Sequence, residues 1–344
     1  MQDPFYQLHW QLLVDPQLQQ LQTEIWVCQL QTKVPTIAGN KWLKLKYHIQ
    51  QIQQHNKTGI VSFGGAFSNH LLALAAAGQA FGFATVGIVR SHLNDPNSPT
   101  LQQCRELGMQ LHFIPPTEYR QACADAERTA CDTATAPPSW QQRFPDYWLV
   151  PEGGTAMQAL PGVAELPLWQ TPLGDADLLV SACASGGTLA GLIAGQLARQ
   201  ETSSRCADIL GIAVVKDSSL ASKIAALLPK AQQYPDWQLW PEQSGKAYGK
   251  FSPETLQFCL QLATDQQLYT EPVYTGKALH SLVQWAQQGR IAPGRRIAFL
   301  HTGGLQGVAG LAMRGLITPQ QQQCLTPSEA TSVATGAGDG SDLN

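Results

Sequence analysis

Charged side chains are scarce in this sequence: Asp, Glu, Lys and Arg make up 14% of its 344 residues, against roughly 25% in an average soluble protein. The formal net charge is -3 at pH 7, which provides no basic surface for nucleic acid. No apolar run approaches the roughly 20 residues of a membrane-spanning helix, and the first residues lack the basic and apolar regions of a signal peptide. We therefore expect a cytoplasmic protein without a nucleic-acid or membrane partner.

Cysteine and histidine patterns that bind metals are also missing. The eight cysteines contain no C-x-x-C pair, so we expect free thiols in a cytoplasmic chain, most of them buried. The eight histidines show no spacing typical of metal ligands. We accordingly predict no structural metal.

The sequence contains instead a regular alternation of short apolar strands and helices, over a length that suffices for one large or two ordinary domains. We predict strands near residues 25–30, 58–63, 84–89, 109–114, 147–150, 177–183, 208–215 and 296–300. We predict helices near 41–49, 71–80, 98–107, 119–133, 189–198, 220–228, 253–264 and 276–288, irregular or extended chain in the rest of 1–38, and a loop at 135–145. This alternation is typical of an α/β protein in which parallel sheets are flanked by helices.

The stretch Ser185-Gly186-Gly187-Thr188 lies between a predicted strand and a predicted helix. The first N–H groups of a helix lack intrahelical partners, and the helix dipole favours negative charge there. The glycines let the backbone close around a phosphate, and the two hydroxyls can add donors. This pattern predicts an anion site; the alternative is that the small residues serve only packing.

A second pattern places two lysines at the start of a helix. In the stretch Gly39-Asn40-Lys41-Trp42-Leu43-Lys44, the two lysines lie one turn apart and are neighbours on the helix surface. Basic residues are unfavourable at a helix N-terminus unless an anion is nearby. The pattern therefore favours an anion site near the two lysines. The alternative interpretation is a basic helix face exposed to solvent.

Glycine pairs recur after four predicted strands, at Gly64-Gly65, Gly153-Gly154, Gly186-Gly187 and Gly303-Gly304. Ligands of open parallel sheets bind at these carboxyl ends of the strands. The first pair is followed by Ser68-Asn69, which suits a carboxylate site, although either residue could simply cap the next helix. No G-x-G-x-x-G opens a helix, which disfavours a dinucleotide site, and no Walker motif is present.

The phosphate turn at 185–188, the Gly-Asn-Lys at 39–41 and the Ser-Asn turn at 68–69 together resemble the pyridoxal-phosphate enzymes of the tryptophan-synthase β-subunit fold, fold type II. Within that group the chain is similar to the 1-aminocyclopropane-1-carboxylate (ACC) deaminase / D-cysteine desulfhydrase family, from about residue 20 to residue 312. The resemblance implies a large domain of residues 1–45 plus 151–318, a small domain of residues 46–150, and pyridoxal 5'-phosphate in the cleft between them. It also implies a homodimer. The small and polar composition of residues 325–344 predicts a disordered tail.

The resemblance also implies roles around the cofactor. Lys41 matches the lysine that holds the cofactor covalently, and Lys44 matches a lysine that faces its phosphate. Asn69 matches the residue beside the pyridoxal hydroxyl, and Ser68 matches a residue at the substrate. The phosphate loop corresponds to Ser185, Gly186, Gly187 and Thr188.

Two tyrosines and two threonines complete the implied site. Tyr248, in Ala-Tyr-Gly, and Tyr274, in Pro-Val-Tyr-Thr-Gly-Lys, match active-site tyrosines; ordinary half-buried packing is the alternative for each. Thr275 falls where the partner of the pyridine nitrogen lies, and Thr302 falls in a loop near the substrate. Deaminase-type members resemble each other in having Glu and then Leu at these two positions, whereas desulfhydrase-type members have Thr or Ser and then Thr.

The resemblance therefore implies a D-cysteine desulfhydrase-like α,β-elimination that yields a 2-oxo acid, ammonia and sulfide. A neutral Thr275 leaves the pyridine ring a weaker electron acceptor than a glutamate would, and a thiolate is a good leaving group. ACC deaminase is the first alternative, and a pyridoxal-phosphate or amino-acid binding protein without turnover is the second. The segment Phe67-Ser68-Asn69-His70-Leu71-Leu72 departs from the family, which has Gln before the Ser and Thr-Arg soon after it.

The expected reaction uses groups from three parts of the chain. The amine of Lys41, or Ser68 helped by a tyrosine, would remove the Cα proton. Tyr274 would donate a proton to the leaving sulfur. The turn of Ser68, Asn69 and His70 would bind the substrate carboxylate with backbone N–H groups at a helix N-terminus.

Overall fold

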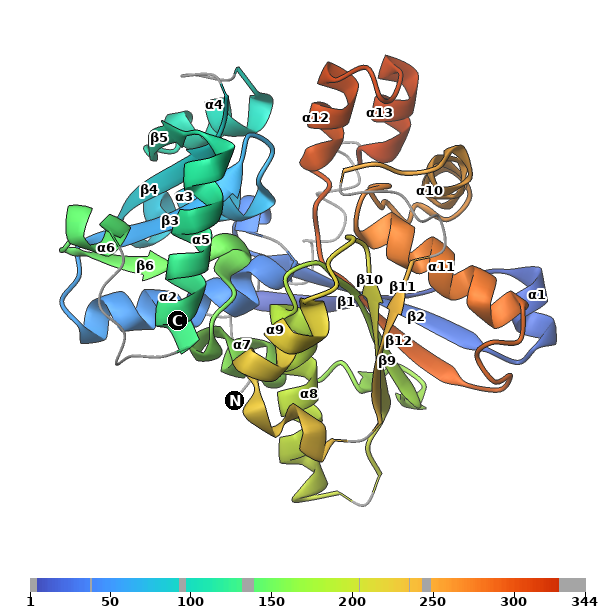
Figure 1. The fold of residues 1–344 in the computed structure, drawn as a ribbon. Coiled ribbons are helices and arrows are strands. Elements are labelled where there is room, and N and C mark those ends of the chain that lie inside the picture. The colour runs from blue at the N-terminus through green and yellow to red at the C-terminus, as the bar shows by residue number, and fades with distance from the viewer. Residues whose placement is uncertain are drawn as a thin grey trace, which may run out of the picture.

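The computed structural model describes residues 5–37, 39–92, 97–131, 139–203, 205–234, 236–242 and 249–327. Its two main sheets lie in separate halves of the molecule, and helices pack around both of them (Figure 1). A third, two-stranded ribbon consists of β7 (Gln170–Thr171) and β8 (Gly174–Asp175). Among the described helices, none is both long enough and apolar enough to cross a membrane.

The larger sheet has six strands in the order β1-β2-β12-β9-β10-β11. All neighbouring strands are parallel except β1, which runs antiparallel to β2. The strands are β1 (Tyr6–Leu12), β2 (Glu24–Thr32), β9 (Leu178–Cys183), β10 (Asp208–Ala213), β11 (Trp237–Pro241) and β12 (Arg296–His301). The central strands β9 and β12 are buried at five of their six positions each, because helices cover both faces of a parallel sheet.

The smaller sheet has four parallel strands in the order β5-β4-β3-β6. They are β3 (Gly59–Gly65), β4 (Ala84–Arg90), β5 (Gln110–Ile114) and β6 (Tyr147–Val150). Six of the seven residues of β3 are buried, so this strand lies at the centre of its half of the molecule.

Most of the helices have the boundaries that their sequences favour. Serine side chains cap the N-termini of α3, α4 and α10, and Gly82 ends α3 in the left-handed conformation. The α-helices are α1 (Pro16–Gln20), α2 (Asn40–Gln54), α3 (Asn69–Phe81), α4 (Pro99–Glu106), α5 (Pro116–Cys131), α6 (Ser139–Arg143), α7 (Leu160–Ala164), α8 (Gly187–Gln200), α9 (Leu220–Leu227), α10 (Pro253–Gln266), α11 (Thr275–Gln287), α12 (Gly307–Met313) and α13 (Pro319–Leu325). Short 3-10 helices are η1 (Pro35–Ile37), η2 (Glu152–Gly154), η3 (Met157–Ala159) and η4 (Pro229–Gln233).

Helix α2 carries both lysines of interest and is held tightly in place. Leu43 and Leu45 are fully buried in the largest hydrophobic core. Helix α7 approaches the backbone of α2 so closely that a Cβ added at Gly162 would lie 1.8 Å from the Leu43 carbonyl oxygen. The lysines therefore project from a rigid element.

The predicted α/β fold with parallel sheets is confirmed, and each predicted strand and helix has a counterpart. Before residue 38 the predicted irregular and extended chain includes the extended strand β1, whereas the short helix α1 was not predicted. The predicted loop at 135–145 contains α6, and β11, α12 and α13 were not predicted. Of the predicted tail, Leu325 is the buried last residue of α13, and residues 328–344 lie outside the described part of the chain.

Cysteines in the described chain are free thiols. Five of them are buried and two have intermediate exposure: Cys28, Cys104, Cys123, Cys183 and Cys259, then Cys206 and Cys324. Burial raises the pKa of Cys183 to about 12, so this thiol is protonated at neutral pH. The expectation of mostly buried free thiols is confirmed for these residues.

Candidate active site

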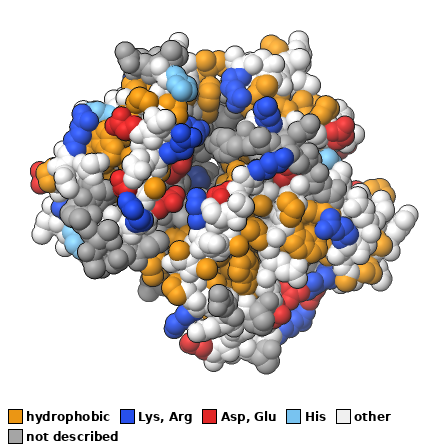
Figure 2. Space-filling view, viewed as in Figure 1, with side chains coloured by type: hydrophobic (Ala, Val, Ile, Leu, Met, Phe, Trp, Pro, Cys, Tyr) orange, Lys and Arg blue, Asp and Glu red, His pale blue; other side chains and the backbone are white. Residues whose placement is uncertain are grey.

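The four glycine-pair turns follow the carboxyl ends of β3, β6, β9 and β12, and contacts between them join the two halves of the molecule. A Cβ added at Gly187, after β9, would lie 3.0 Å from Thr155 Oγ1, after β6. A Cβ added at Gly304, after β12, would lie 3.3 Å from Asn69 Nδ2, after β3. On the face drawn in Figure 2 the surface dips between the halves, and both basic and acidic side chains lie around this hollow. The turns thus converge on one place.

An anion cradle forms at the start of α8. Gly186 adopts φ +84°, a conformation that glycine favours, and no side chain caps this helix N-terminus. Ser185 and Thr155 hydroxyls are 2.7 Å apart, and the Thr188 hydroxyl accepts a hydrogen bond of 2.8 Å from Asn40 Nδ2. Free N–H groups and hydroxyls at a helix N-terminus are suited to bind an anion.

The cradle is completed by Lys44, which is 3% exposed. Its Nζ donates to the Gly153 carbonyl oxygen at 3.2 Å and to Thr155 Oγ1 at 3.3 Å. A Cβ added at Gly187 would lie 3.2 Å from the same Nζ. The Lys44 ammonium therefore faces the start of α8. The space between them is open because residue 187 is a glycine and has no Cβ.

Lys41 and Lys44 of α2 both have pKa values lowered toward neutral pH. Burial lowers the pKa of Lys41 to about 8. Burial and the positive charge of Lys41 together lower the pKa of Lys44 to about 7. Two ammonium groups in a poorly hydrated place repel each other, so an anion bound here would restore both charges.

Two buried histidines lie behind the lysines. The Ser62 hydroxyl has one hydrogen, which it donates to the Val150 carbonyl oxygen at 2.8 Å; it must therefore accept from His70 Nε2–H, also at 2.8 Å. His70 Nδ1 is then a lone-pair acceptor, and it has no partner among the described residues. Burial and the charges of Lys41 and Lys44 hold the pKa of His70 well below its ordinary value, so the ring is neutral. His48 binds the Gly154 carbonyl oxygen at 3.4 Å.

The turn before α3 carries Ser68 and Asn69. Ser68 Oγ accepts a hydrogen bond of 3.2 Å from Leu71 N, so Ser68 does serve as the N-cap. Asn69 does not cap; its Oδ1 is buried and has no partner within the described chain. The Asn69 side chain instead faces Gly304.

The start of α11 meets the end of β12 through two hydroxyls. Thr275 Oγ1 is 3.1 Å from Thr302 Oγ1 and donates to the Gly303 carbonyl oxygen at 3.2 Å. A Cβ added at Gly39, just before α2, would lie 2.5 Å from the Thr302 carbonyl oxygen. Thr275, Thr302 and the start of α2 are therefore adjacent.

The structure thus gathers most of the residues selected from the sequence at the ends of the strands. Tyr274 has intermediate exposure and is the N-cap residue of α11, whereas Tyr248 lies outside the described residues. Sequence reasoning missed Thr155 and Glu271. Thr155 directly follows a glycine pair, and this signal could have identified it. For Glu271 the sequence offers only one signal, its position shortly before α11.

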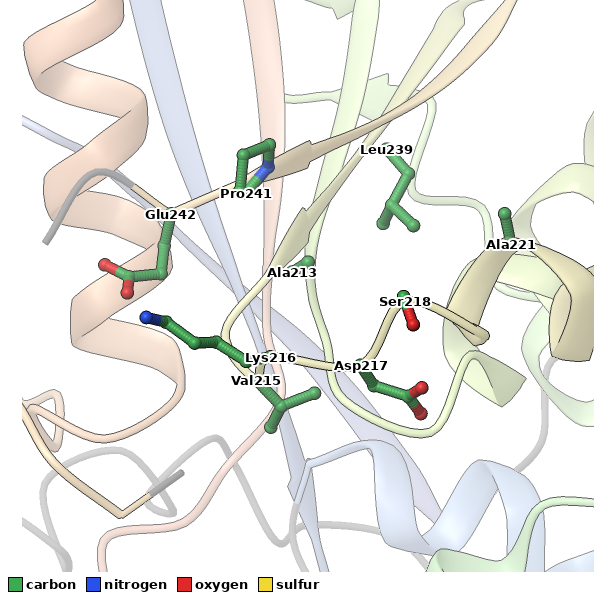
Figure 3. Close-up of a pocket in the computed structure, with 9 residues that line it drawn as sticks. All are labelled: Ala213, Val215, Lys216, Asp217, Ser218, Ala221, Leu239, Pro241 and Glu242. Atoms are coloured by element: carbon green, nitrogen blue, oxygen red, sulfur yellow. The ribbon is translucent and has the colours of Figure 1, made fainter. Parts of the chain in front are cut away.

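A separate cavity of about 510 Å³ lies at the carboxyl ends of β10 and β11. Figure 3 shows its lining, which combines Val215 and Leu239 with the polar side chains of Lys216, Asp217 and Ser218. Helix α9 forms one wall through Ala221, and the same helix packs on Gly186 through Ile224. The cavity is therefore a neighbour of the anion cradle.

The fold and site define an α/β enzyme with an anion cradle beside Lys41 and the buried Lys44. A family model described as pyridoxal-phosphate dependent enzyme matches residues 12–303, and the chain belongs to this family. Its cofactor is accordingly pyridoxal 5'-phosphate, as the sequence predicted.

Relatives and solved structures agree with this assignment. A bifunctional D-cysteine desulfhydrase/1-aminocyclopropane-1-carboxylate deaminase of Arabidopsis thaliana is 26% identical over 83% of this chain and 73% of its own. A D-cysteine desulfhydrase of Serratia proteamaculans is 26% identical over 82% of this chain and 86% of its own. The crystal structure of an ACC deaminase homologue shares the fold, with a TM-score of 0.68, 22% identity, and coverage of 90% of this chain and 93% of that one.

The described residues fit the cofactor chemically. A phosphate group needs donors and positive charge, which the start of α8 and Lys44 provide. An aldehyde needs an amine that is partly unprotonated at neutral pH, and the pKa of Lys41 is lowered to about 8. The gap at Gly187, which an added Cβ would fill, leaves room for the anion.

Proposed function

We propose that this enzyme is a D-cysteine desulfhydrase, which converts D-cysteine and water to pyruvate, ammonia and hydrogen sulfide. The observation that carries the proposal is the 3.1 Å contact between the Thr275 and Thr302 hydroxyls. These are the two positions at which the resemblance separates desulfhydrase-type from deaminase-type members. Both relatives described above bear the name D-cysteine desulfhydrase.

The proposed roles follow the geometry of the site. Lys41 holds the cofactor covalently, and its freed amine or Ser68 takes the Cα proton of the substrate. Lys44 and the loop of Ser185, Gly186, Gly187 and Thr188 hold the phosphate. When bound, pyridoxal 5'-phosphate supplies an electron sink for the charge that develops at Cα.

The remaining roles concern the substrate and the ring of the cofactor. Asn69 would bind the ring hydroxyl of the cofactor, and Thr275 would be the partner of the ring nitrogen. The backbone of the 68–70 turn binds the substrate carboxylate, at the N-terminus of α3. Tyr274 or Tyr248 protonates the leaving sulfur, and Thr302 lies near the substrate.

ACC deaminase activity is the second candidate, because the Arabidopsis relative carries both names. We test the two by incubating the purified holoenzyme with D-cysteine or ACC and measuring sulfide, pyruvate and 2-oxobutanoate. We expect sulfide and pyruvate from D-cysteine at a kcat/KM at least tenfold above that for ACC. The double variant Thr275→Glu, Thr302→Leu should reverse this order. Preference of the wild type for ACC would refute the proposal, and binding of the cofactor without turnover of either compound would favour a binding protein.

We also propose a division into a large domain (1–45 plus 151–318) and a small domain (46–150), a homodimer, and a cytoplasmic location. The two separate sheets support the division, because β3 to β6 form one and the other long strands form the second. Light scattering of the purified protein tests the dimer, and fractionation of the source cells tests the location. Hydrogen exchange of the cofactor-free protein in rising urea tests the division, because separate domains would lose the protection of β3 and of β9 at different urea concentrations.

A further inference from the structure

The first turn of α11 is held by a buried carboxylate. Glu271 is 2% exposed. Its two oxygens accept hydrogen bonds of 2.7–3.1 Å from the backbone N–H groups of Val273, Tyr274 and Thr275. One side chain therefore fixes the backbone of three consecutive residues that lead into α11: Val273, the N-cap residue Tyr274, and Thr275, the first helical residue, whose N–H has no intrahelical partner.

Glu271 also lies beside the turn that carries Asn69. A Cβ added at Gly304 would lie 3.3 Å from Glu271 Cγ and 3.3 Å from Asn69 Nδ2. Thr275, whose N–H binds Glu271 at 2.7 Å, contacts Thr302 through its hydroxyl. The carboxylate thus connects the start of α11 to both loops that line the proposed ring site.

The ionised carboxylate is held in this place against a desolvation penalty. Burial raises the pKa of Glu271 to about 7, although the three N–H groups and Lys277 act in the opposite direction. Because the folded-state pKa is above the ordinary 4.5, the folded chain binds the extra proton between about pH 4.5 and 7. Glu271 therefore weakens folding increasingly as the pH rises through this window.

The charged surroundings do not remove this penalty. Lys277 Nζ is 3.7 Å from Glu242 Oε1, and it makes no hydrogen bond within the described chain. Glu242 lines the cavity of Figure 3 and also lies beside Lys277 of α11. Cys259, on α10, is a neutral thiol, since burial raises its pKa to about 12. One ammonium thus faces two carboxylates.

We propose that Glu271 is a positioning residue of the pyridoxal-phosphate site, whose carboxylate holds the first turn of α11 so that Tyr274 and Thr275 face the cofactor. The proposal rests on the roles proposed above for these two residues. A glutamine at this place would avoid the penalty of a buried charge, but its NH2 group would face the Val273 or Thr275 N–H, which needs an acceptor. The carboxylate provides acceptors for all three donors, and the site depends on them.

The test compares wild type, Glu271→Gln and the matched control Glu118→Gln, an exposed glutamate in the first turn of α5. The cofactor is removed, and its dissociation constant is measured by absorbance titration from pH 5.5 to 8.5. Hydrogen exchange of residues 272–278 is followed in the cofactor-free proteins. We expect Glu271→Gln to bind the cofactor at least tenfold more weakly at pH 8 and to exchange this segment faster, with Glu118→Gln like wild type.

Thermal unfolding checks the buried charge, and cofactor affinity separates positioning from a merely structural cap. The melting temperature of Glu271→Gln relative to wild type should rise between pH 5.5 and 8.5, because the wild type becomes charged in this range. A merely structural cap would show the same pH dependence and leave cofactor affinity unchanged. Cofactor affinity within twofold of wild type overturns the proposal.

Glu271→Asp serves if the glutamine variant does not fold: a folded aspartate variant with tenfold weaker cofactor binding supports the proposal, and wild-type binding overturns it. The cofactor titration, the hydrogen exchange and the thermal unfolding all work without an amino-acid substrate. If the protein is inactive on D-cysteine, the proposed reaction is contradicted. The proposed positioning role of Glu271 is still tested by these three measurements.

Discussion

Removing the Lys44 ammonium should stabilise the cofactor-free protein, although it destroys a predicted binding group. The pKa of Lys44 falls from 10.5 to about 7 on folding, and each pKa unit corresponds to about 1.4 kcal/mol. The folded state therefore disfavours the charged lysine by about 4 kcal/mol at pH 7. This penalty is complete below pH 7 and fades as the pH rises toward 10.5, because the unfolded lysine then loses its proton too.

Lys44→Met keeps the size of the side chain and loses the hydrogen bonds to the Gly153 carbonyl oxygen and Thr155 Oγ1, about 1 kcal/mol each. We expect the cofactor-free variant to be about 2 kcal/mol more stable than wild type at pH 7. The gain should disappear near pH 9, and at pH 10 the variant should be about 1 kcal/mol less stable than wild type. The control is Lys230→Met, which changes an exposed lysine.

Urea unfolding of the cofactor-free proteins at pH 7 and pH 10 measures both values. Inorganic phosphate, as a probe of the cradle, should stabilise the wild type by about 1.4 kcal/mol at ten times its dissociation constant. It should not stabilise Lys44→Met. A variant that is less stable than wild type at pH 7, or that phosphate still stabilises equally, would refute the reasoning about this site.

Three further predictions concern single side chains. Lys41→Ala should lose the visible absorbance of the bound cofactor and at least a thousandfold in kcat while remaining folded by circular dichroism; full activity would contradict its role. Gly187→Ala places a Cβ 3.0 Å from Thr155 Oγ1, so cofactor affinity, measured by titration, should fall at least tenfold, and an unchanged affinity would show that the cradle is not there. Ser62→Ala removes the acceptor of His70 Nε2–H and should destabilise the protein by about 1–3 kcal/mol in urea unfolding; no loss of stability would mean that His70 has another partner.

The fold class could be predicted from short stretches. A buried parallel strand needs a run of apolar residues, and a helix needs its own periodicity and caps, so β9, α8 and their neighbours are visible in the sequence. Elements that depend on their surroundings were missed. Strand β11 has mixed burial at the edge of its sheet, and α6 has five residues, so neither carries a strong local pattern.

The candidate site was predictable where a local motif marks it. Gly186, Gly187 and Thr188 open a helix after a strand, and Lys41 and Lys44 start another, so their spacing alone indicates an anion. Thr155 and Glu271 depend on residues brought together by folding: Thr155 Oγ1 contacts Ser185 Oγ across 30 positions, and Glu271 meets Asn69 at Gly304.

By itself the sequence determined that β–α units would place glycine turns at strand ends and a lysine pair at the start of an early helix, because backbone geometry and helix dipoles are local properties. Only the tertiary structure decided which of these groups meet and in what state of charge. The pKa values of Lys41, Lys44 and Glu271 are all moved toward neutrality. The reason is desolvation, which depends on the atoms that surround a charge and not on its neighbours in the chain.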